Sequence, residues 1–425
     1  MMAHRALRTS PHRIVRGLLL TVFCSLFLSA AAAAAPITIT VAFWGAESEY
    51  DDIWIPIRTA FEAAHPEISL ELMHVTESFQ DKMISMALAG QPADVWMSNA
   101  DTALSYSLAG LTENLRPFMA KDPTFEADQF FPAALDAYAL GDVQFGLPSH
   151  FQTTAIWYNA DLFAEAGLPQ PPDTWRWADF ETSAERLTRD LNGDGETEQW
   201  GLVMPFSGEF LLPWLYSAGG GVVDDNDRPA RAAIGDPPSL TALGFLQRLA
   251  AEERVIEPRF GNADPFYAGS VGMYSYYAVA QRMAAYAQFP YNVARLPAGP
   301  AGSINAVVPG GFVMGKGDHQ AAAWELMKFI AQRGAFSYNT VPAYLPLART
   351  DDWPFVPVPP NYNRAAFVAS AMSARPHMIK TPVVADIYRA VNELRPALTG
   401  NAAIGPAAAQ VARRIDAVLR EQADR

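Results

Sequence analysis

The hydrophobic pattern of the chain alternates between short apolar runs and stretches with helical spacing. Residues 37–44 (ITITVAFW) are β-branched and aromatic, which predicts a buried strand. Apolar residues then recur at helical spacing from Ile53 to Ala64, which predicts a helix that Pro66 ends. The segment 68–75 (ISLELMHV) predicts a second strand. A strand, a helix and a strand over so short a length indicate a right-handed, parallel βαβ unit.

The alternation continues with a predicted helix over residues 79–89, closed by Gly90, and a third strand over residues 93–97. These elements predict a doubly wound α/β lobe. Ligands of open parallel sheets bind beyond the carboxyl ends of the strands, although a turn or a helix cap also explains polar residues there. The candidate ligand contacts at these strand ends are Trp44, Gly45, Glu47, Ser98, Asn99, Asp101 and Thr102.

The middle of the chain predicts a connector that leads into a second lobe. Residues 153–159 read as a strand, and residues 161–166 as a short helix that Gly167 ends. The prolines of the segment 168–173 (LPQPPD) keep it extended, and Thr174 is the predicted cap of the next helix. This stretch carries no catalytic pattern, so we expect its role to be architectural.

The remaining pattern supplies the elements of the second lobe and the return of the chain. The predicted strands cover residues 199–206 and 271–277, and an apolar segment over residues 304–315 is broken by Pro309-Gly310-Gly311. The predicted helices cover residues 213–221, 320–333 and 406–420, and residues 351–361 form a Pro-rich surface crossing.

The first 35 residues read as an export signal. A leader with four arginines precedes the apolar core 17–28, and the small residues 29–35 favour cleavage after Ala35. Cys24 follows two bulky residues and lacks the small residues that a lipid anchor needs. The sequence therefore predicts an exported, periplasmic protein, and no second long apolar run follows the signal.

Composition limits the partners of the mature chain. Removal of the signal leaves 390 residues, enough for two lobes, and changes the formal net charge from −14 to −18. This charge favours solubility and argues against nucleic acid and anionic membranes as partners. Cys24 is the only cysteine, so the mature chain must be stabilised by core burial without disulfides.

Several motifs occur in an order that resembles one family. Residues 158–180 carry Tyr-Asn, Asp-Leu-Phe, Ala-Gly-Leu and Pro-Pro-Asp-Thr-Trp in succession. Supporting motifs are AGQPADVW (89–96), LAGLTENL (108–115), GLPSH (146–150), DLNGDGETEQWGL (190–202) and AAAWELMKFI (321–330). In this order they resemble the extracellular solute-binding proteins of sugar ABC importers, the family-1 group that includes the maltose-binding protein.

The resemblance implies two α/β lobes that close on a ligand, as in type II periplasmic binding proteins. The implied lobes are residues 36–150 plus 305–340 and residues 152–304 plus 341–425. The crossings fall near Ser149 and Pro309, where Gly310 and Gly311 suit a hinge. It further implies a monomer without cofactor or metal that delivers its ligand to the membrane permease of an ABC importer.

The resemblance also implies site residues beyond the strand ends. Gln152 falls where the family often places a polar hydrogen-bonding residue, although the maltose-binding relative has a carboxylate there. Glu209 fits a sugar-contacting carboxylate, and Tyr276 and Tyr277 end a strand that delivers an aromatic side chain to the cleft. The other implied ligand contacts are His150, Trp214, Gly311, Phe312 and Arg375.

These residue types suit a pyranose, which has apolar faces and a rim of hydroxyls. Aromatic rings cover the faces, and carboxylates and amides bond the hydroxyls, although core packing is the commoner fate of any one aromatic residue. An anionic ligand such as a glycerophosphate needs cations, and the candidate cleft positions show few apart from Arg375, so we expect a neutral sugar or polyol. Three alternatives stay open: a binding protein for a glycerophosphate-type ligand, a binding protein that reports to a membrane sensor kinase, and an exported glycoside hydrolase that uses Asp101 and Glu209.

The segment 190–195 (DLNGDG) copies the first half of a calcium loop. Gly201 stands at the twelfth position, where such a loop needs a bidentate Glu. We therefore interpret this segment as a turn between a helix and a strand. The seven histidines show no zinc spacing, and two of them lie in the signal.

Overall fold

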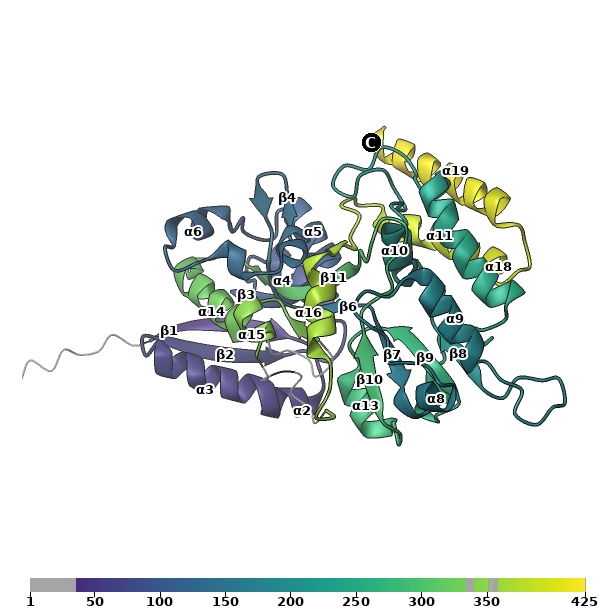
Figure 1. Cartoon of the computed structure of the whole chain (residues 1–425). Coiled ribbons are helices and arrows are strands. Elements are labelled where there is room, and N and C mark those ends of the chain that lie inside the picture. The colour runs from purple at the N-terminus through teal and green to yellow at the C-terminus, as the bar shows by residue number, and fades with distance from the viewer. Residues whose placement is uncertain (1–35, 334–339, 351–352, 354–357, 425) are drawn as a thin grey trace, which may run out of the picture.

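Two α/β lobes lie side by side in the computed structural model (Figure 1). The structure describes residues 36–333, 340–350, 353 and 358–424. The predicted signal, residues 1–35, lies outside the described residues, and so does most of the Pro-rich segment 351–361. The fold class predicted from the sequence is confirmed.

The first lobe is built on a sheet of order β12-β6-β11-β3-β1-β2, with β13 paired to β11. Its strands are β1 (Ile37–Phe43), β2 (Ile68–His74), β3 (Val95–Asn99), β6 (Leu147–Thr153), β11 (Ala306–Met314), β12 (Val341–Pro342) and β13 (Arg375–Pro376). β1 pairs in parallel with both β2 and β3, which confirms the predicted parallel unit. β11 runs antiparallel to β3 and β6, so the sheet is mixed.

Helices cover this sheet and follow its strands. The longer α-helices are α3 (Ile55–Ala64), α4 (Phe79–Leu88), α5 (Ala100–Leu108), α14 (Gln320–Arg333) and α16 (Arg364–Met372). The shorter elements are α2 (Glu47–Glu49), η2 (Tyr50–Trp54), α6 (Arg116–Lys121), η3 (Ala127–Gln129), α7 (Pro132–Asp136), β4 (Ala139–Leu140), β5 (Val143–Gln144) and α15 (Leu345–Ala348). α5 begins directly after β3 and α4 begins after a short loop that follows β2, so both helices border any ligand at that edge of the sheet.

The second lobe has a smaller sheet of order β10-β7-β9-β8. Its strands are β7 (Ala155–Asn159), β8 (Trp200–Val203), β9 (Val271–Tyr276) and β10 (Tyr291–Ala294). Its helical elements are α8 (Ala160–Glu165), α9 (Trp177–Leu187), α10 (Gly208–Ser217), α11 (Pro237–Gln247), η4 (Arg248–Glu252), α12 (Asp264–Tyr267), α13 (Ala280–Tyr286), α17 (Val384–Val391), η5 (Asn392–Leu394), α18 (Arg395–Leu398) and α19 (Ile404–Ala423).

The connector into the second lobe folds differently at one point from the prediction. α9 begins after Arg176, whose backbone N–H donates to the Asp179 carboxylate at 2.8 Å, so Thr174 is not the cap. Trp175 is buried and its indole N–H donates to the carbonyl of Arg295 at 2.8 Å. The connector is thus anchored on the second lobe by its Trp.

The chain crosses between the lobes at Thr154 and Asn305. β6 ends at Thr153 and β7 begins at Ala155, while Asn305 lies immediately before β11. The Asn305 side-chain amide donates to the carbonyl of Thr154 at 2.6 Å, which ties the two crossings together. A third crossing passes through β13 toward α17.

The observed crossings lie a few residues from the predicted positions near Ser149 and Pro309, because these two residues lie within the paired strands β6 and β11. A Cβ atom on Gly310 would lie 2.3 Å from Nε2 of His150, and one on Gly311 would lie 2.2 Å from the carbonyl oxygen of Leu147. These glycines permit close strand packing at a β-bulge.

The predicted lobe boundary after residue 340 also needs correction. β12 pairs with β6 in the sheet of the first lobe, so the third crossing lies further along the chain.

Candidate functional site

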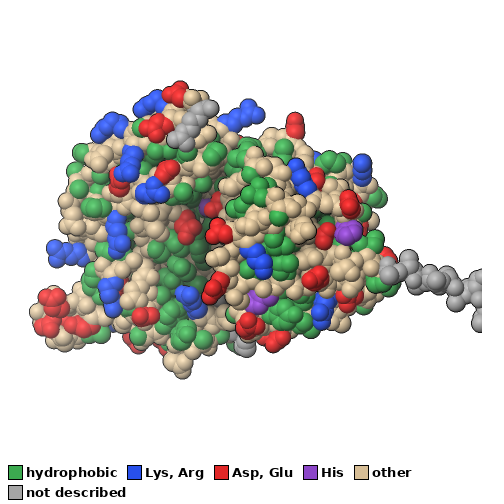
Figure 2. Space-filling view, turned by 180° about the vertical axis from the view of Figure 1, so that it is seen from behind, with side chains coloured by type: hydrophobic (Ala, Val, Ile, Leu, Met, Phe, Trp, Pro, Cys, Tyr) green, Lys and Arg blue, Asp and Glu red, His purple; other side chains and the backbone are tan. Residues whose placement is uncertain are grey.

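A groove runs between the two lobes, and acidic side chains gather along it (Figure 2). Two of the predicted carboxylates come from opposite lobes. Asp101 lies in the first turn of α5, directly after β3, and Glu209 lies in the first turn of α10. Burial raises the pKa of Glu209, and the charge of Asp101 raises it further. The charge of Asp101 on the first lobe therefore reaches Glu209 on the second lobe.

Aromatic rings line the same region of the second lobe. Tyr276 stacks on Phe210 with ring centroids 4.9 Å apart, and Tyr277 lies 4.6 Å from the same ring. The Tyr277 hydroxyl is buried and faces the Glu209 carboxyl, and this burial raises the pKa of Tyr277. Both tyrosines are half-buried, so they retain surface for a ligand.

Sequence reasoning missed three residues near Asp101, because they come from other elements. Burial has the largest effect on the pKa of Tyr138, of His377 in the third crossing and of Tyr388 on α17, and the charge of Asp101 raises all three pKa values. Burial lowers the pKa of His377, and its Nδ1 lies 3.1 Å from the carbonyl oxygen of Val307. Tyr138 donates to the carbonyl of Ser98 at 2.5 Å, which fixes the turn that carries Asp101.

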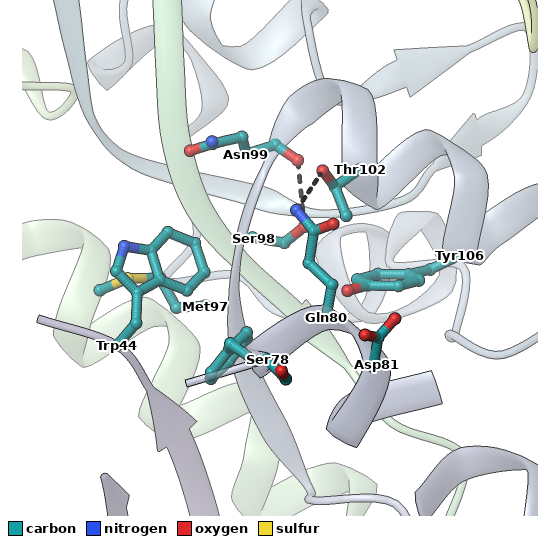
Figure 3. A pocket seen from close by; sticks show the side chains of 10 residues that line it. Trp44, Ser78, Gln80, Asp81, Met97, Ser98, Asn99, Thr102 and Tyr106 are labelled. Atoms are coloured by element: carbon teal, nitrogen blue, oxygen red, sulfur yellow. Dashed lines mark hydrogen bonds between the residues drawn. The ribbon is translucent and has the colours of Figure 1, made fainter. Parts of the chain in front are cut away.

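A pocket of about 400 Å³ opens on the first lobe beside Asp101 (Figure 3). It collects predicted residues from two strand ends, Trp44 after β1 and Ser98 and Asn99 at the end of β3. Further lining residues come from β3, from the start of α4 and from α5. These are Ser78, Phe79, Gln80, Asp81, Met97, Thr102 and Tyr106. We name this cavity the side pocket.

Two residues predicted as ligand contacts are core residues instead. Trp214 is fully buried and packs against Phe180 with ring centroids 5.4 Å apart. Phe312 is also buried and packs edge-on against Trp54 at 5.9 Å. Gly311 serves the strand packing described above. Periodicity does not separate such buried aromatics from cleft aromatics.

The remaining predicted contacts are spread around the first lobe. Glu47 is 84% exposed at its side chain, with one carboxylate oxygen 3.8 Å from Nδ1 of His74. His150 lies on β6 with Nδ1 2.9 Å from Oγ of Ser149, and burial lowers the pKa of His150 to about 4. Gln152 lies on β6 opposite Val308 and is half-buried.

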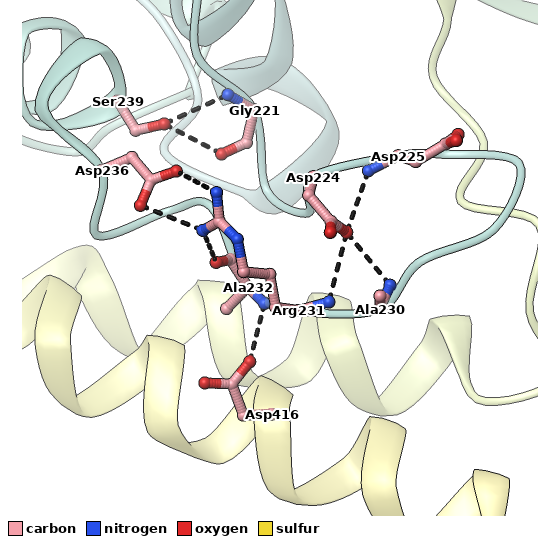
Figure 4. A network of polar contacts seen from close by, with 9 residues as sticks. All are labelled: Gly221, Asp224, Asp225, Ala230, Arg231, Ala232, Asp236, Ser239 and Asp416. Carbon is pink, nitrogen blue, oxygen red and sulfur yellow. Dashed lines mark hydrogen bonds and ion pairs between the residues drawn. The ribbon is translucent and has the colours of Figure 1, made fainter.

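Arg375 lines a second cavity, different from the side pocket. Its guanidinium sits 5.5 Å from the ring centroid of Tyr216, and the cavity has a volume of about 450 Å³. Beside this cavity the Asp224 carboxylate accepts the backbone N–H groups of Ala230 and Arg231, and Arg231 pairs with Asp236 at 3.0 Å (Figure 4). The charges of Asp224, Arg231 and Asp236 are therefore stabilised by groups of the second lobe itself.

A buried cation joins the lobes on the same side. The Lys380 side chain is 1% exposed, and Nζ lies 2.7 Å from the Asp227 carboxylate of the second lobe and 3.4 Å from the Asp136 carboxylate of the first lobe. Lys380 is therefore paired with carboxylates of both lobes. Elsewhere, burial raises the pKa of Tyr276 and the positive charge of Arg282 on α13 lowers it.

The segment 190–195 forms the predicted turn. The Asp190 carboxylate accepts the backbone N–H groups of Gly193 at 2.6 Å and Gly195 at 2.8 Å. Asp190, Asp194 and Glu198 place carboxylate oxygens within 4.8 Å of one another, and all three are exposed. Hydrogen bonds from backbone N–H groups of the turn hold these three carboxylates close together.

The chain belongs to the family of bacterial extracellular solute-binding proteins, whose model matches residues 45–335. It is similar to a protein of Brucella abortus (strain 2308) that is named only as a binding protein, with 24% identity over 77% of this chain and 79% of the relative. No helix in the described part of the chain has the length and apolar character needed to span a membrane.

Two solved sugar-binding proteins share the fold. The cyclic α-maltosyl-1,6-maltose binding protein from Arthrobacter globiformis has a TM-score of 0.76 at 20% identity, covering 91% of this chain and all of the other. The sugar-binding protein MalE from Xanthomonas citri has a TM-score of 0.74 at 20% identity, covering 90% of this chain and 98% of the other.

Proposed function

We propose that this protein is the substrate-binding component of an ABC importer that captures a neutral sugar or polyol between its lobes. The observation that carries the proposal is that Asp101 and Glu209 come from opposite lobes, that the charge of one reaches the other, and that two half-buried tyrosines lie beside Glu209. Carboxylates accept hydrogen bonds from hydroxyls, and tyrosine rings cover the apolar face of a pyranose. Of the two solved proteins with this fold, one binds a cyclic maltosyl-maltose and the other is a sugar-binding protein, which is consistent with this chemistry.

The proposed mechanism is lobe closure. A ligand that bonds Asp101 contacts Glu209 only when the lobes approach, so binding favours the closed state by its differential affinity. Hydroxyl donors also relieve the repulsion between the two carboxylates. The permease then recognises the closed shape, and the protein leaves the ligand chemically unaltered.

Charge favours a neutral ligand over a glycerophosphate. Among the described residues no Lys or Arg forms an ion pair with Asp101 or Glu209. Lys380 pairs with the Asp227 carboxylate, and Arg375 lines the second cavity together with several aspartates. The charge of Arg282 reaches Tyr276, but a phosphate in the groove would still face the two carboxylates.

A thermal-shift screen of the chain without residues 1–35 tests this function. The screen covers monosaccharides, disaccharides, polyols and a glycerophosphodiester. A ligand of the native state at about one hundred times its Kd stabilises by about 2.7 kcal/mol, so a neutral sugar or polyol should raise the Tm. Stabilisation by the glycerophosphodiester alone would contradict the proposal. Release of reducing sugar during incubation would favour the glycoside hydrolase instead.

A further inference from the structure

The third crossing places His377 at the carboxyl end of β3, the edge of the first sheet where ligands of open sheets bind. β13 pairs in parallel with Ala306 and Val307 of β11, whose other edge is taken by β6. β3 pairs antiparallel with β11 from Gly310 onward, so β13 lies in line with β3 and the carboxyl ends of the two strands point toward each other. His377 follows β13 directly and Asp101 follows β3, and the two residues therefore lie at the same edge.

Hydrogen bonds hold the His377 ring in one orientation and assign its tautomer. The backbone N–H of His377 donates to the carbonyl oxygen of Val307 at 3.0 Å, and Nδ1 of the ring lies 3.1 Å from the same oxygen. A carbonyl oxygen only accepts, so Nδ1 carries the proton of the neutral ring. Nε2 is then unprotonated and is a hydrogen-bond acceptor.

The acceptor at Nε2 is unused in the described part of the chain. It forms no hydrogen bond with a described residue, and it is not one of the fully buried polar atoms without a partner, so it keeps some accessible surface although the whole residue is only 8% exposed. Burial lowers the pKa of His377 and the charge of Asp101 opposes this effect, so the ring is neutral at neutral pH. A sugar hydroxyl is a donor that matches such an acceptor.

His377 is also tied to the part of the second lobe that carries Glu209. Its carbonyl oxygen accepts a hydrogen bond from the Tyr388 hydroxyl at 2.7 Å. The Tyr388 ring lies against the first residue of α10, because a Cβ atom on Gly208 would lie 2.6 Å from Cδ1 of Tyr388. Glu209 is the next residue of that helix. The histidine thus connects the sheet edge that carries Asp101 with the helix start that carries Glu209.

We propose that His377 is a specificity-determining ligand contact, whose Nε2 accepts a hydrogen bond from one hydroxyl of the sugar or polyol bound in the groove. The carboxylates of Asp101 and Glu209 are acceptors as well, so these three residues select a ligand by the positions of its donor hydroxyls. A ligand without a donor at the position of Nε2 leaves that atom desolvated and unbonded, and it binds less tightly. This inference rests on the proposed sugar-binding function and adds to it a residue that distinguishes one sugar from another.

Two substitutions separate the two ring nitrogens of His377. In His377→Asn the side-chain amide replaces Nδ1 as the donor to Val307, and no group remains at the position of Nε2. In His377→Gln the amide reaches the position of Nε2, and the bond to Val307 is lost. His319→Asn is the matched control, because the His319 ring lies 3.4 Å from the carboxylate of Asp94, just before the start of β3 and thus at the opposite edge of the sheet.

Calorimetry tests the contact. The probes are glucose, galactose, mannose, arabinose, maltose and mannitol, and the one that binds the wild type most tightly is titrated into the three variants. His377→Asn should bind it about fivefold more weakly, with a ligand-free Tm within about 2 °C of the wild type. His377→Gln should keep the affinity within about twofold and have the lower Tm, and His319→Asn should keep the affinity of the wild type.

Deoxyfluoro derivatives of the same probe identify the hydroxyl, because fluorine cannot donate a hydrogen bond. One derivative should bind the wild type about fivefold more weakly than its parent and bind His377→Asn as tightly as the parent does. In the wild type labelled with ¹⁵N at histidine, the Nε2 signal of His377 should be that of an unprotonated nitrogen and should shift when the probe saturates the protein, a measurement that needs no variant.

Unchanged affinity in His377→Asn, a larger loss in His377→Gln than in His377→Asn, or an Nε2 signal that the probe does not shift would overturn the contact while sugar binding stands. The second of these results would make His377 a structural residue of the crossing. Failure of all the probes to bind the wild type would remove the proposed function and the contact together.

Discussion

Replacement of Glu209 by Gln separates the charge of the interlobe site from its shape. The amide has the same size and still bonds a sugar hydroxyl, but it removes the charge. Burial and Asp101 both raise the pKa of Glu209, so the folded protein holds the ionised carboxylate at a cost. The variant should therefore be more stable than the wild type at neutral pH and bind sugar less tightly.

The size of both effects follows from the site. A hydrogen bond to a charged group contributes about 1.5–3 kcal/mol and a neutral one about 0.5–1.5, so affinity should fall by about 1–1.5 kcal/mol, or roughly five- to twelvefold. Relief of the partly exposed charge should contribute up to about 1 kcal/mol of stability, or about 2–4 °C in Tm for a lobe of this size.

The stability effect has a definite pH dependence. A carboxyl whose folded-state pKa is raised contributes stability below its unfolded value of 4.5, and that stability is lost as the pH rises through the folded-state pKa. The Tm gain of Glu209→Gln should thus be present at neutral pH and vanish below the unfolded value. Scanning fluorimetry at neutral pH and below pH 4.5 measures the change in Tm. Calorimetry with the sugar identified in the screen measures the change in affinity.

Glu126→Gln, at an exposed carboxylate of the first lobe, is the matched control and should change neither quantity. A lower Tm for Glu209→Gln at neutral pH, or unchanged sugar affinity, would refute the reasoning, because the carboxylate would then be a structural group outside the ligand site.

Three further results are expected. Trp214→Ala should lower the free energy of unfolding by about 3–5 kcal/mol in urea titration, because the side chain is fully buried; a loss below about 1 kcal/mol would place it outside the core. Gly311→Ala should lower the Tm, since its Cβ would lie 2.2 Å from the Leu147 carbonyl oxygen, whereas Gly405→Ala meets no atom within 4 Å and should not. The NMR shifts of His150 should show a neutral ring down to about pH 4, and titration near its ordinary value of 6.5 would contradict the burial.

Local patterns predicted most of the elements well. β1 and β2 begin where their apolar runs begin, and α14 has the predicted bounds, because periodicity and punctuation by Gly and Pro act over short distances. The hinge could not be predicted from the same signals. Glycine alone suggests a flexible backbone. Gly310 and Gly311 instead allow close packing against His150 and Leu147, which lie far away in the sequence.

The same contrast between local sequence signals and long-range contacts applies to the site. Residues at strand ends, such as Trp44, Asn99 and Thr102, were found because topology places strand ends together, and they meet in the side pocket. His377 was missed because a third crossing brings it near Asp101, and no spacing in the sequence shows this. Tyr106 was missed because an apolar helix face predicts burial but not an unbonded hydroxyl.

The central claim is that a small polyhydroxylated ligand draws the two lobes together, and small-angle X-ray scattering tests it most directly. Curves are recorded without ligand and with a saturating amount of the sugar identified in the screen. We predict a smaller radius of gyration with the sugar, and a weaker change for Glu209→Gln at the same sugar concentration. Identical curves for the free and the saturated wild type would contradict the account.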